Sequence, residues 1–266
     1  MIPYPVTDAD DPRIASFRNI RERDLASRDG LFIAEGKVVL SVLFAARRFE
    51  PVSVLILDRR LAGMAEVLET APPDLPVYVA PAQVIDEIAG FHLHRGVLAL
   101  ARRRSPEPLG ALVESMPARC MVPVLVNIAN HDNVGSIFRN AAAFGAAAVL
   151  LDSSCCDPLY RKAIRVSVGA ALKVPFSIAG DIDAIFSKLD RAGFRQIALS
   201  PGGSATLDRI EPQGRIALYL GTEGEGLPPA LMQRMATVRI PMARDFDSLN
   251  VAAASAIVMH HFFAEG

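Results

Sequence analysis

Two residues suited to substrate binding, Asn133 and Arg139, follow the apolar run Val122–Ile128 in a polar segment that turns into a helical pattern. Asn133 is predicted to be the N-cap of that helix. The buried stripe of the helix has the spacing i, i+4 and i+7 and consists of Ile137, Ala141 and Phe144. Arg139 falls outside the stripe, beside the carboxyl end of the strand. A guanidinium there suits an anionic or hydroxyl-bearing substrate, although a solvated arginine on a helix face is the simpler interpretation of this segment alone.

A glycine-rich loop is predicted directly after a second apolar run, Ile216–Leu220. Its three glycines are Gly221, Gly224 and Gly226. They let a ligand approach the backbone closely and meet exposed N–H and C=O groups. The loop lacks the Lys-Ser/Thr ending of a P-loop and the spacing of a dinucleotide-binding turn, and Glu223 and Glu225 would repel phosphate. The segment therefore does not predict a phosphate site, and an ordinary tight turn explains it equally well when it is taken alone.

Ser248 and Asn250 precede a predicted helix, Ala252–Phe263, and follow the apolar stretch Ile240–Met242. Ser248 is expected to be the N-cap, because a serine hydroxyl accepts hydrogen bonds from the free N–H groups of a first turn. Helix capping explains this third segment adequately as a lone feature.

A sheet must position these segments, because short apolar runs alternate with helical patterns along the second half of the chain. This alternation predicts an α/β fold with a mostly parallel sheet covered on both faces, whose ligands bind at the carboxyl ends of the strands. The predicted strands are Val122–Ile128, Ala147–Leu151, Gln196–Leu199 and Ile216–Leu220.

The first half predicts a smaller α/β domain. Its expected helices are Lys37–Ala46 and Arg60–Glu69, and its expected strands are Val52–Leu57, Val77–Val79 and Gly96–Ala101. The charged, proline-containing stretch Arg102–Pro108 has no apolar periodicity and is typical of a linker. We therefore divide the chain into an N-terminal domain (1–104), a linker (105–119) and a second α/β domain (120–266).

The composition excludes several classes of protein. With 51% hydrophobic and 21% charged residues, the 266-residue chain is globular and not disordered. Its longest apolar stretch, Ala141–Leu151, is well short of the roughly 18 residues that span a bilayer, and no secretory signal is visible, so we expect a cytoplasmic protein. The three cysteines and five histidines lack the spacing of metal ligands, so no metal is expected. The net charge of −1 neither indicates nor excludes a nucleic-acid partner.

Taken together and in this order, the three segments resemble motifs one, two and three of the SpoU (TrmH-like) RNA ribose methyltransferases of the SPOUT superfamily. The matching residues are Asn133–Ala141 with Phe144–Gly145, Leu220–Glu223 with Gly226–Leu227, and Ile240–Met242 with Ser248–Val251. The likeness is specific over about residues 120–264. More loosely, Gly30–Gly36 and His94–Ala99 are similar to the family's ribosomal-protein-like, RNA-binding N-terminal domain.

The resemblance implies methyl transfer from S-adenosylmethionine to a ribose 2′-hydroxyl of structured RNA, with 23S rRNA ahead of tRNA. It implies a homodimer whose sites draw on both chains, and a deep trefoil knot in the second domain. The cofactor would be contacted by Ser200, Leu220, Gly221, Ile240, Met242 and Leu249. The implied catalytic residues are Arg139, Asn133, Glu223, Ser248 and Asn250.

In the family, the arginine of motif one activates the hydroxyl, which makes it Arg139 here. Because a guanidinium stays protonated, we expect Arg139 to stabilise the developing alkoxide and to grip the adjacent phosphate, not to act as a base. Glu223 is expected to orient Arg139 or Asn133. Ser248 and Asn250 would complete the pocket through hydrogen bonds.

The RNA-gripping residues remain open at the level of sequence. The candidate clusters are Arg18, Arg21, Arg23 and Arg28; Arg102–Arg104; and Arg161, Lys162, Arg165 and Lys173. Each cluster is also typical of a solvated surface. The terminal helix, with Met259 and Phe262, is expected either to join a dimer interface or to be buried within its own domain.

One departure from the family pattern and two rival functions remain. Motif three usually has a glycine where this chain has Ala243–Phe246, which leaves substrate identity open and makes Arg244 a further RNA-contact candidate. The first rival is a catalytically silent RNA-binding protein of the same fold, against which the intact motif residues argue. The second is a nicotinamide oxidoreductase, which would need an early G-x-G-x-x-G turn that this chain lacks.

Overall fold

The computed structural model describes residues 2–18, 30–90, 95–104, 107–243 and 248–263. The chain forms two compact units. Unit 1 comprises Met1–Ser105 and Leu159–Lys173, and unit 2 comprises Pro106–Pro158 and Val174–Gly266. The first break follows Ser105, whereas residues 106–119 of the predicted linker belong to unit 2. The segment Leu159–Lys173, which the sequence division places in the second domain, instead packs with unit 1.

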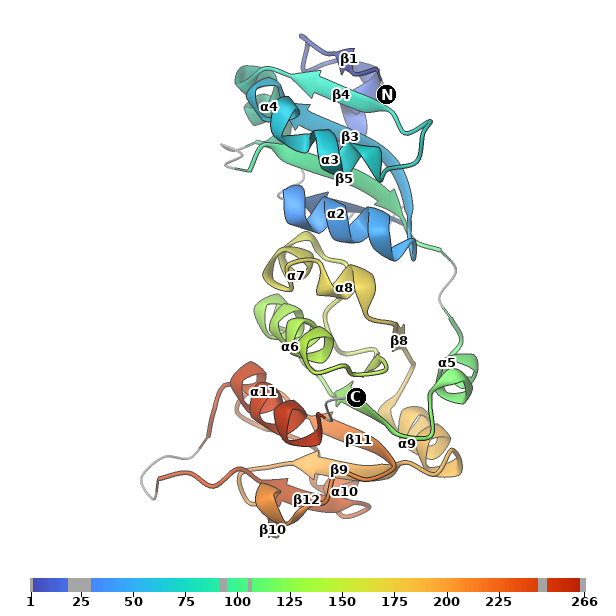
Figure 1. The fold of residues 1–266 in the computed structure, drawn as a ribbon. Coiled ribbons are helices and arrows are strands. Elements are labelled where there is room, and N and C mark those ends of the chain that lie inside the picture. Colours follow the sequence, from blue (N-terminus) through green and yellow to red (C-terminus); the bar gives the residue numbers. More distant parts are fainter. Residues whose placement is uncertain (1, 19–29, 91–94, 105–106, 244–247, 264–266) are drawn as a thin grey trace. The chain divides into compact units, whose positions relative to one another are not determined.

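Unit 1 is built on a five-stranded mixed sheet in the order β1-β4-β3-β5-β2 (Figure 1). Its strands are β1 (Tyr4–Pro5), β2 (Leu31–Glu35), β3 (Glu50–Leu57), β4 (Val77–Ala80) and β5 (Val97–Arg102). Strand β5 runs antiparallel to both β2 and β3, whereas β3 and β4 are parallel. The three predicted strands are therefore present, and β1 and β2 add an edge on each side.

The α-helices of unit 1 are α2 (Lys37–Ala46), α3 (Ala65–Glu69), α4 (Ala82–Ala89), α7 (Arg161–Val166) and α8 (Ala170–Lys173), with 3-10 turns η1 (Pro12–Phe17) and η2 (Asp58–Met64). Helix α2 has the predicted bounds. The predicted helix Arg60–Glu69 is wrong in its first half, which is the 3-10 turn η2. Gly63 lies in that half, and glycine disfavours an α-helical interior.

Helix α7 packs against the edge strand β2, and α8 packs against α2. Glu35 at the end of β2 is only 4% exposed. Its carboxylate accepts a hydrogen bond from Arg161 of α7, at 2.8 Å between Nη1 and Oε2. A buried carboxylate is costly unless it is paired, so this contact helps to fix the Leu159–Lys173 segment on unit 1.

Arg161→Ala is expected to lower the free energy of unfolding by about 3 kcal/mol, because it deprives the buried Glu35 carboxylate of its charged partner. Urea unfolding of the full chain measures the loss. Arg102→Ala is a matched control, because the ion pair of Arg102 with Glu50 spans 3.9 Å between two exposed side chains. An exposed pair contributes about 0–1 kcal/mol. Equal losses in the two variants would contradict the role given to Arg161.

Unit 2 contains a seven-stranded sheet in the order β10-β12-β9-β11-β6-β7-β8, and every pairing in it is parallel. Its strands are β6 (Cys120–Leu125), β7 (Val149–Leu151), β8 (Phe176–Ile178), β9 (Arg195–Leu199), β10 (Ala205–Thr206), β11 (Arg215–Leu220) and β12 (Ala236–Arg239). The prediction of an α/β fold with a parallel sheet is confirmed. Because all strands point the same way, the loops after β6, β9, β11 and β12 meet at one edge of the sheet.

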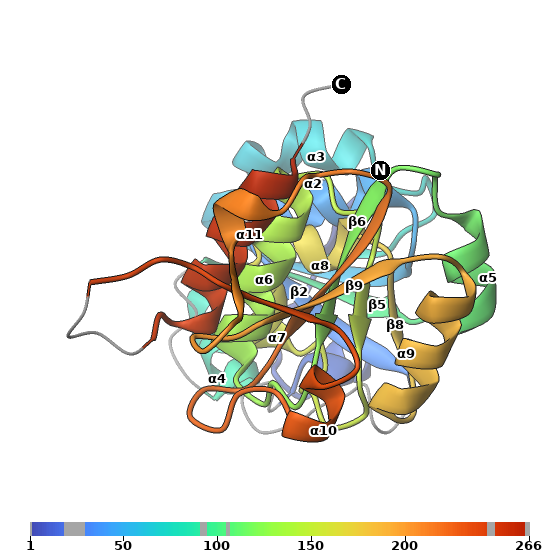
Figure 2. The same cartoon turned by 90° about the horizontal axis from the view of Figure 1, so that it is seen from below.

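Helices cover both faces of this sheet. They are α5 (Leu109–Ser115), α6 (His131–Ala143), α9 (Ile182–Arg191), α10 (Pro229–Met232) and α11 (Val251–Phe262), with a 3-10 turn η3 (Leu207–Arg209). Helices α6 and α11 lie side by side on one face, and α5 and α9 pack together on the other (Figures 1 and 2). No helix in the described ranges is both long and apolar enough to cross a membrane.

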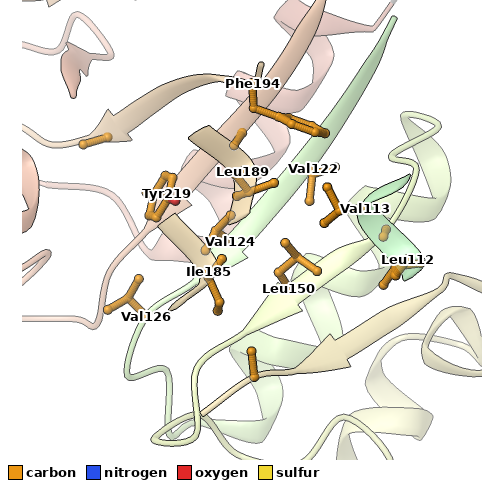
Figure 3. Close-up of a cluster of buried hydrophobic side chains, with 14 of the residues drawn as sticks. Leu112, Val113, Val122, Val124, Val126, Leu150, Ile185, Leu189, Phe194 and Tyr219 are labelled. Atoms are coloured by element: carbon orange, nitrogen blue, oxygen red, sulfur yellow. The ribbon is translucent and has the colours of Figure 1, made fainter. Parts of the chain in front are cut away.

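The core between the sheet and the pair α5 and α9 is formed mainly by aliphatic side chains from strands and helices, together with Phe194 and Tyr219 (Figure 3). Val122 and Val124 of β6 face Leu112 of α5 and Ile185 of α9 in this cluster. Tyr219 of β11 is fully buried in it. Burial raises the pKa of Tyr219, so the phenol stays neutral and donates a hydrogen bond to Gln196 at 2.5 Å. This packing makes the sheet a rigid base for its loops.

Both predicted N-caps are wrong. Strand β6 ends at Leu125, three residues earlier than predicted, and helix α6 begins at His131. The N-cap of α6 is Asn130, whose side chain accepts a hydrogen bond from the N–H of Asp132. Asn133 therefore lies in the first turn. Helix α11 is capped by Asn250 and not by Ser248. In each case a neighbouring asparagine holds the cap position, which residue type alone cannot distinguish.

Candidate functional site

A cavity of about 560 Å³ lies in unit 2 where the loops after β9, β11 and β12 meet the start of α11. Pockets that hold small molecules and cofactors usually measure about 300–1,000 Å³. All six residues predicted to contact a cofactor line this cavity: Ser200, Leu220, Gly221, Ile240, Met242 and Leu249. Three of the predicted catalytic residues also line it: Glu223, Ser248 and Asn250. The structure thus brings motifs two and three together around one space.

The glycine-rich loop folds tightly back on itself below the cavity. Thr222 and Gly226 form a β-bridge, and the N–H of Gly226 donates to the carbonyl of Thr222 at 3.1 Å. A Cβ atom at Gly221 would lie 2.4 Å from the carbonyl carbon of Gly226 and 2.6 Å from its oxygen. Only glycine therefore fits at position 221. The glycine-rich loop is a tight turn, and the same turn lines the cavity.

The backbone around Ser200 also approaches strand β12 closely, and this contact fixes another wall of the cavity. The N–H of Ser200 donates to the carbonyl of Val238 in β12 at 2.9 Å. Three residues later, a Cβ atom at Gly203 would lie 2.4 Å from the carbonyl carbon of Val238. The backbone around Ser200 is thereby held against the strand that leads to Ile240 and Met242.

Asn133, Glu223 and Asn250 form a closed hydrogen-bonded triangle, which joins all three motifs. Asn133 Nδ2 donates to Glu223 Oε1 at 3.0 Å, and Asn250 Nδ2 donates to the same oxygen at 2.6 Å. Asn250 Nδ2 also lies 3.0 Å from Asn133 Oδ1. Glu223 therefore contacts Asn133, one of the two residues it was expected to orient, and its charge is stabilised by two amide donors.

Asn250 has a second contact, because its side-chain carbonyl caps α11. Its Oδ1 accepts from the N–H groups of Ala252 at 2.9 Å and Ala253 at 3.4 Å. The capping residue of the terminal helix is thus also a member of the triangle, so the start of α11 and the position of Glu223 are coupled.

Asn250→Ala is expected to lower the free energy of unfolding by about 1 kcal/mol, because the cap is lost. Asn250→Ser keeps a capping oxygen but has no amide donor for Glu223. The serine variant should therefore unfold at nearly the wild-type urea concentration while losing activity to the same extent as the alanine variant. A serine variant as unstable as the alanine variant would show that the lost stability does not come from the cap.

Asn140 and Ser255 support the site, although no role was predicted for either residue. Asn140 Nδ2 of α6 donates to the carbonyl of Ala252 at 2.8 Å and to Ser255 Oγ at 2.9 Å. Ser255 is fully buried. These bonds tie α6 to the first turn of α11. The available signal was a serine within an otherwise apolar helix, a position that normally requires a hydrogen-bonding partner.

Arg139 is not brought into the cavity of its own chain. It is exposed on α6, does not line the cavity and makes no hydrogen bond or ion pair with any described residue. It follows Asn133 by six residues, which turns it by roughly 120° away from Asn133 around the helix axis. Asn133 is instead 6% exposed and joins the triangle. The expected contact between Glu223 and Arg139 is therefore absent among the described residues.

The basic clusters differ in whether their side chains already form ion pairs within the protein. Arg18 is paired with Asp10 at 3.0 Å, and Arg161 is paired with Glu35. Arg21, Arg23, Arg28 and Arg244 lie outside the described residues. RNA contact through any of these clusters stays a prediction. Within the described part of the chain, no group of three or more histidine, cysteine, aspartate or glutamate side chains is gathered to hold a metal ion.

The parallel sheet with a cavity at the carboxyl ends of its strands is typical of α/β domains that bind a small ligand or cofactor. Residues 121–260 match the SpoU rRNA methylase family, and the chain belongs to that family.

The relatives of this chain agree with that assignment. It is 42% identical over 265 residues to an uncharacterized tRNA/rRNA methyltransferase of Mycobacterium bovis, covering 96% of this chain and 90% of the other. The structure is similar to an AdoMet-bound rRNA methyltransferase from Sinorhizobium meliloti, with a TM-score of 0.81, 23% identity and 97% of each chain covered. It is equally similar to a solved RNA 2′-O ribose methyltransferase, with a TM-score of 0.81, 24% identity, and 97% of this chain and 98% of the other covered.

Proposed function

We propose that the protein is an RNA methyltransferase that transfers the methyl group of S-adenosylmethionine to a ribose 2′-hydroxyl, with 23S rRNA ahead of tRNA as its substrate. The observation that carries the proposal is the assembly of motifs two and three around one cavity, joined to motif one through the Asn133–Glu223–Asn250 triangle. Family membership supports the same reaction. We place the enzyme in the cytoplasm, where such RNA is found.

The cavity fits the cofactor in shape and in charge. Ile240, Met242 and Leu249 provide apolar surface for an adenine ring, and the tight loops present backbone groups for hydrogen bonds. Among the described lining residues there are two carboxylates, Glu223 and Glu225, and no lysine, arginine or histidine. This balance favours a cationic ligand such as a sulfonium. When bound, the cofactor supplies an electrophilic methyl group.

The protein's own residues would bind, orient and activate the ribose. Asn133 and Asn250 hold Glu223 in place, and Ser248 offers a hydroxyl at the mouth of the cavity. The Arg139 guanidinium would stabilise the negative charge that develops on the 2′-oxygen while the hydroxyl proton passes to solvent and the oxygen takes the methyl group from the sulfonium. The N–H donors of the guanidinium would also bind the RNA phosphate next to the reacting ribose.

The position of Arg139 outside its own cavity supports a homodimer in which each arginine serves the partner's cavity. The terminal helix α11, whose Ile257 is 43% exposed, and the neighbouring Phe263, 40% exposed, would contribute apolar surface to that interface. We also assign a deep trefoil knot to the second unit, formed where the chain passes the glycine-rich loop before α11, and an RNA-binding role to the N-terminal unit.

Incubation of the purified protein with methyl-labelled S-adenosylmethionine and separated 23S rRNA or tRNA tests the proposal. Label should enter ribose 2′-oxygens of rRNA, and mapping of 2′-O-methyl sites in cells with and without the gene should identify the nucleotide. Calorimetry should show cofactor binding by the protein alone. Absence of both binding and transfer would favour the catalytically silent RNA-binding protein, whereas labelled bases would overturn the assignment to ribose.

A further inference from the structure

Asp152, which directly follows β7, is a buried carboxylate without a catalytic assignment. It is 7% exposed and forms no ion pair with any described residue. Its charge is stabilised instead by backbone N–H groups. The N–H of Asn127 lies 3.0 Å from Oδ2 and 3.2 Å from Oδ1, and the N–H groups of Ser154 and Cys155 donate to Oδ1 at 3.1 and 3.0 Å. Hydrogen bonds to a buried anion are strong, so this cluster is rigid.

Cys155 adds a second set of bonds to the same neighbouring loop. Its Sγ accepts from the N–H of Ile128 and donates to the carbonyl of Leu125, both at 3.3 Å. Burial raises the pKa of the Cys155 thiol, so it stays protonated and keeps its donor. The N–H of Cys156 then donates to the carbonyl of Ile128 at 3.0 Å. We call residues 152–156 the β7 bracket.

The loop held by the β7 bracket is the one that leads from β6 into α6. Within it, Asn127 has a φ of 54°, a left-handed conformation that a non-glycine residue adopts only when its surroundings fix it. On the other side, the N–H of Val126 donates to the carbonyl of Leu220 at 2.9 Å, directly before the glycine-rich loop. The loop is therefore bound from both sides immediately before the helix that carries Asn133 and Arg139.

We infer that Asp152, supported by Cys155, is a positioning residue for methyl transfer, which sets the place of the first turn of α6 and thereby of Asn133 against Glu223. The inference rests on the proposed function for its activity readout. The bond of Asn133 to Glu223 is 3.0 Å long, and a hydrogen bond weakens steeply when its groups are displaced. No residue of the bracket lines the cavity, so its effect on the cofactor should be small.

Asp152→Ala is expected to lower kcat at saturating RNA and cofactor by about 10- to 100-fold, as misplacement by about 1 Å does elsewhere, while the Kd for S-adenosylmethionine changes by less than about twofold. Asp152→Asn retains Oδ1, which accepts from three N–H groups, and should recover most of the activity. Cys155→Ser keeps both a donor and an acceptor and should be nearly normal. Loss of cofactor affinity in parallel with kcat, or an unchanged kcat in Asp152→Ala, would overturn the inference.

A control variant separates positioning from stability. Asp181 caps α9, where its carboxylate accepts from the N–H of Ala184 at 2.7 Å, and its side chain forms no hydrogen bond with residues 125–130 or with the β7 bracket. Asp181→Ala should lower the urea concentration at the midpoint of unfolding, because a helix cap is lost, without changing kcat. If Asp181→Ala and Asp152→Ala lower kcat equally, the effect is one of stability, and the inference fails.

Two further readouts test whether Asp152 acts through Asn133. In an Asn133→Ala background, adding Asp152→Ala should reduce kcat by less than about twofold, because the contact it supports is already gone. Full additivity would contradict the inference. Hydrogen exchange of the Asn133 and Val134 amides should be faster in Asp152→Ala than in Asp181→Ala. Hydrogen exchange tests the positioning role even if the wild-type protein methylates no RNA. Absence of RNA methylation would contradict the proposed function alone.

Discussion

Arg139→Ala is expected to reduce kcat by about 100- to 1,000-fold, the usual cost of removing a donor that stabilises an oxyanion. Cofactor affinity should be unchanged, because Arg139 does not line the cavity of its own chain. Arg139→Lys keeps the charge but loses the fork of donors and should restore only a small part of the rate. The measurement is single-turnover methyl transfer to RNA, with calorimetry of the cofactor alongside it.

Arg191→Ala is the matched control for this substitution. Arg191 is also an exposed helical arginine of unit 2, but it lies on α9, on the opposite face of the sheet, and its Nε donates to the carbonyl of Ser187. Its loss should leave methyl transfer unchanged. An Arg139→Lys variant with near-normal kcat would contradict the proposed bidentate contact of Arg139 with alkoxide and phosphate.

Mixing experiments test whether Arg139 acts across a dimer. An Arg139→Ala chain and a chain with a damaged cavity should each be inactive as homodimers. If the arginine serves the partner, random pairing gives half heterodimers with one competent site each, so about one quarter of wild-type activity should return. No recovery on mixing and re-pairing of subunits would place the arginine and the cavity in the same chain.

Gly221→Ala is expected to abolish cofactor binding, raising the Kd by about 100-fold or more. The added methyl group would lie 2.4 Å from the carbonyl carbon of Gly226, and the contact is with backbone, which cannot rotate aside. The loop must therefore open, and with it the cavity wall formed by residues 221–227. Loss of several backbone hydrogen bonds to a ligand, each contributing about 0.5–1.5 kcal/mol, accounts for an effect of this size. Calorimetry with S-adenosylmethionine measures it.

Gly202→Ala provides the comparison. Gly202 also lies in a loop at the carboxyl end of a strand, after Ser200, but a Cβ atom there would meet nothing within 4 Å. That variant should bind the cofactor with wild-type affinity. If both alanine variants bind normally, the tight backbone contact at Gly221 has no part in shaping the cavity.

The strands of the parallel sheet were predictable because they are continuous apolar runs, and such runs are typical of strands buried on both faces. The residues of the cavity were also predictable, but only because three separate motifs were considered together. Periodicity alone does not place Ile240 or Met242 near Ser200, since their proximity depends on the order in which the strands pair.

What the sequence did not reveal are features set by local competition between similar residues or by tertiary contact. Asn130 and Asn133 are the same residue type three positions apart, and only the end of β6 decides which one caps α6. Asp152 and Ser255 have no motif of their own. Their roles arise from groups that folding brings to them: the backbone N–H of Asn127 for Asp152, and the side-chain amide of Asn140 for Ser255. The exposure of Arg139 follows from helix geometry and was foreseen, but its separation from Glu223 was not.

Because the segment Leu159–Lys173 packs with unit 1 while the chain on either side of it belongs to unit 2, the polypeptide passes from one unit to the other at three places, after Ser105, Pro158 and Lys173. Neither half is therefore encoded by one continuous stretch of the gene. A fragment ending at residue 105 would leave Glu35 without Arg161, and a fragment starting at residue 106 would carry Ile164 and Leu172, both fully buried in the whole chain, without the surface that covers them. Expression of the two units as separate proteins should yield poorly soluble products unless the segment Leu159–Lys173 is grafted onto the first fragment and replaced in the second by a short linker.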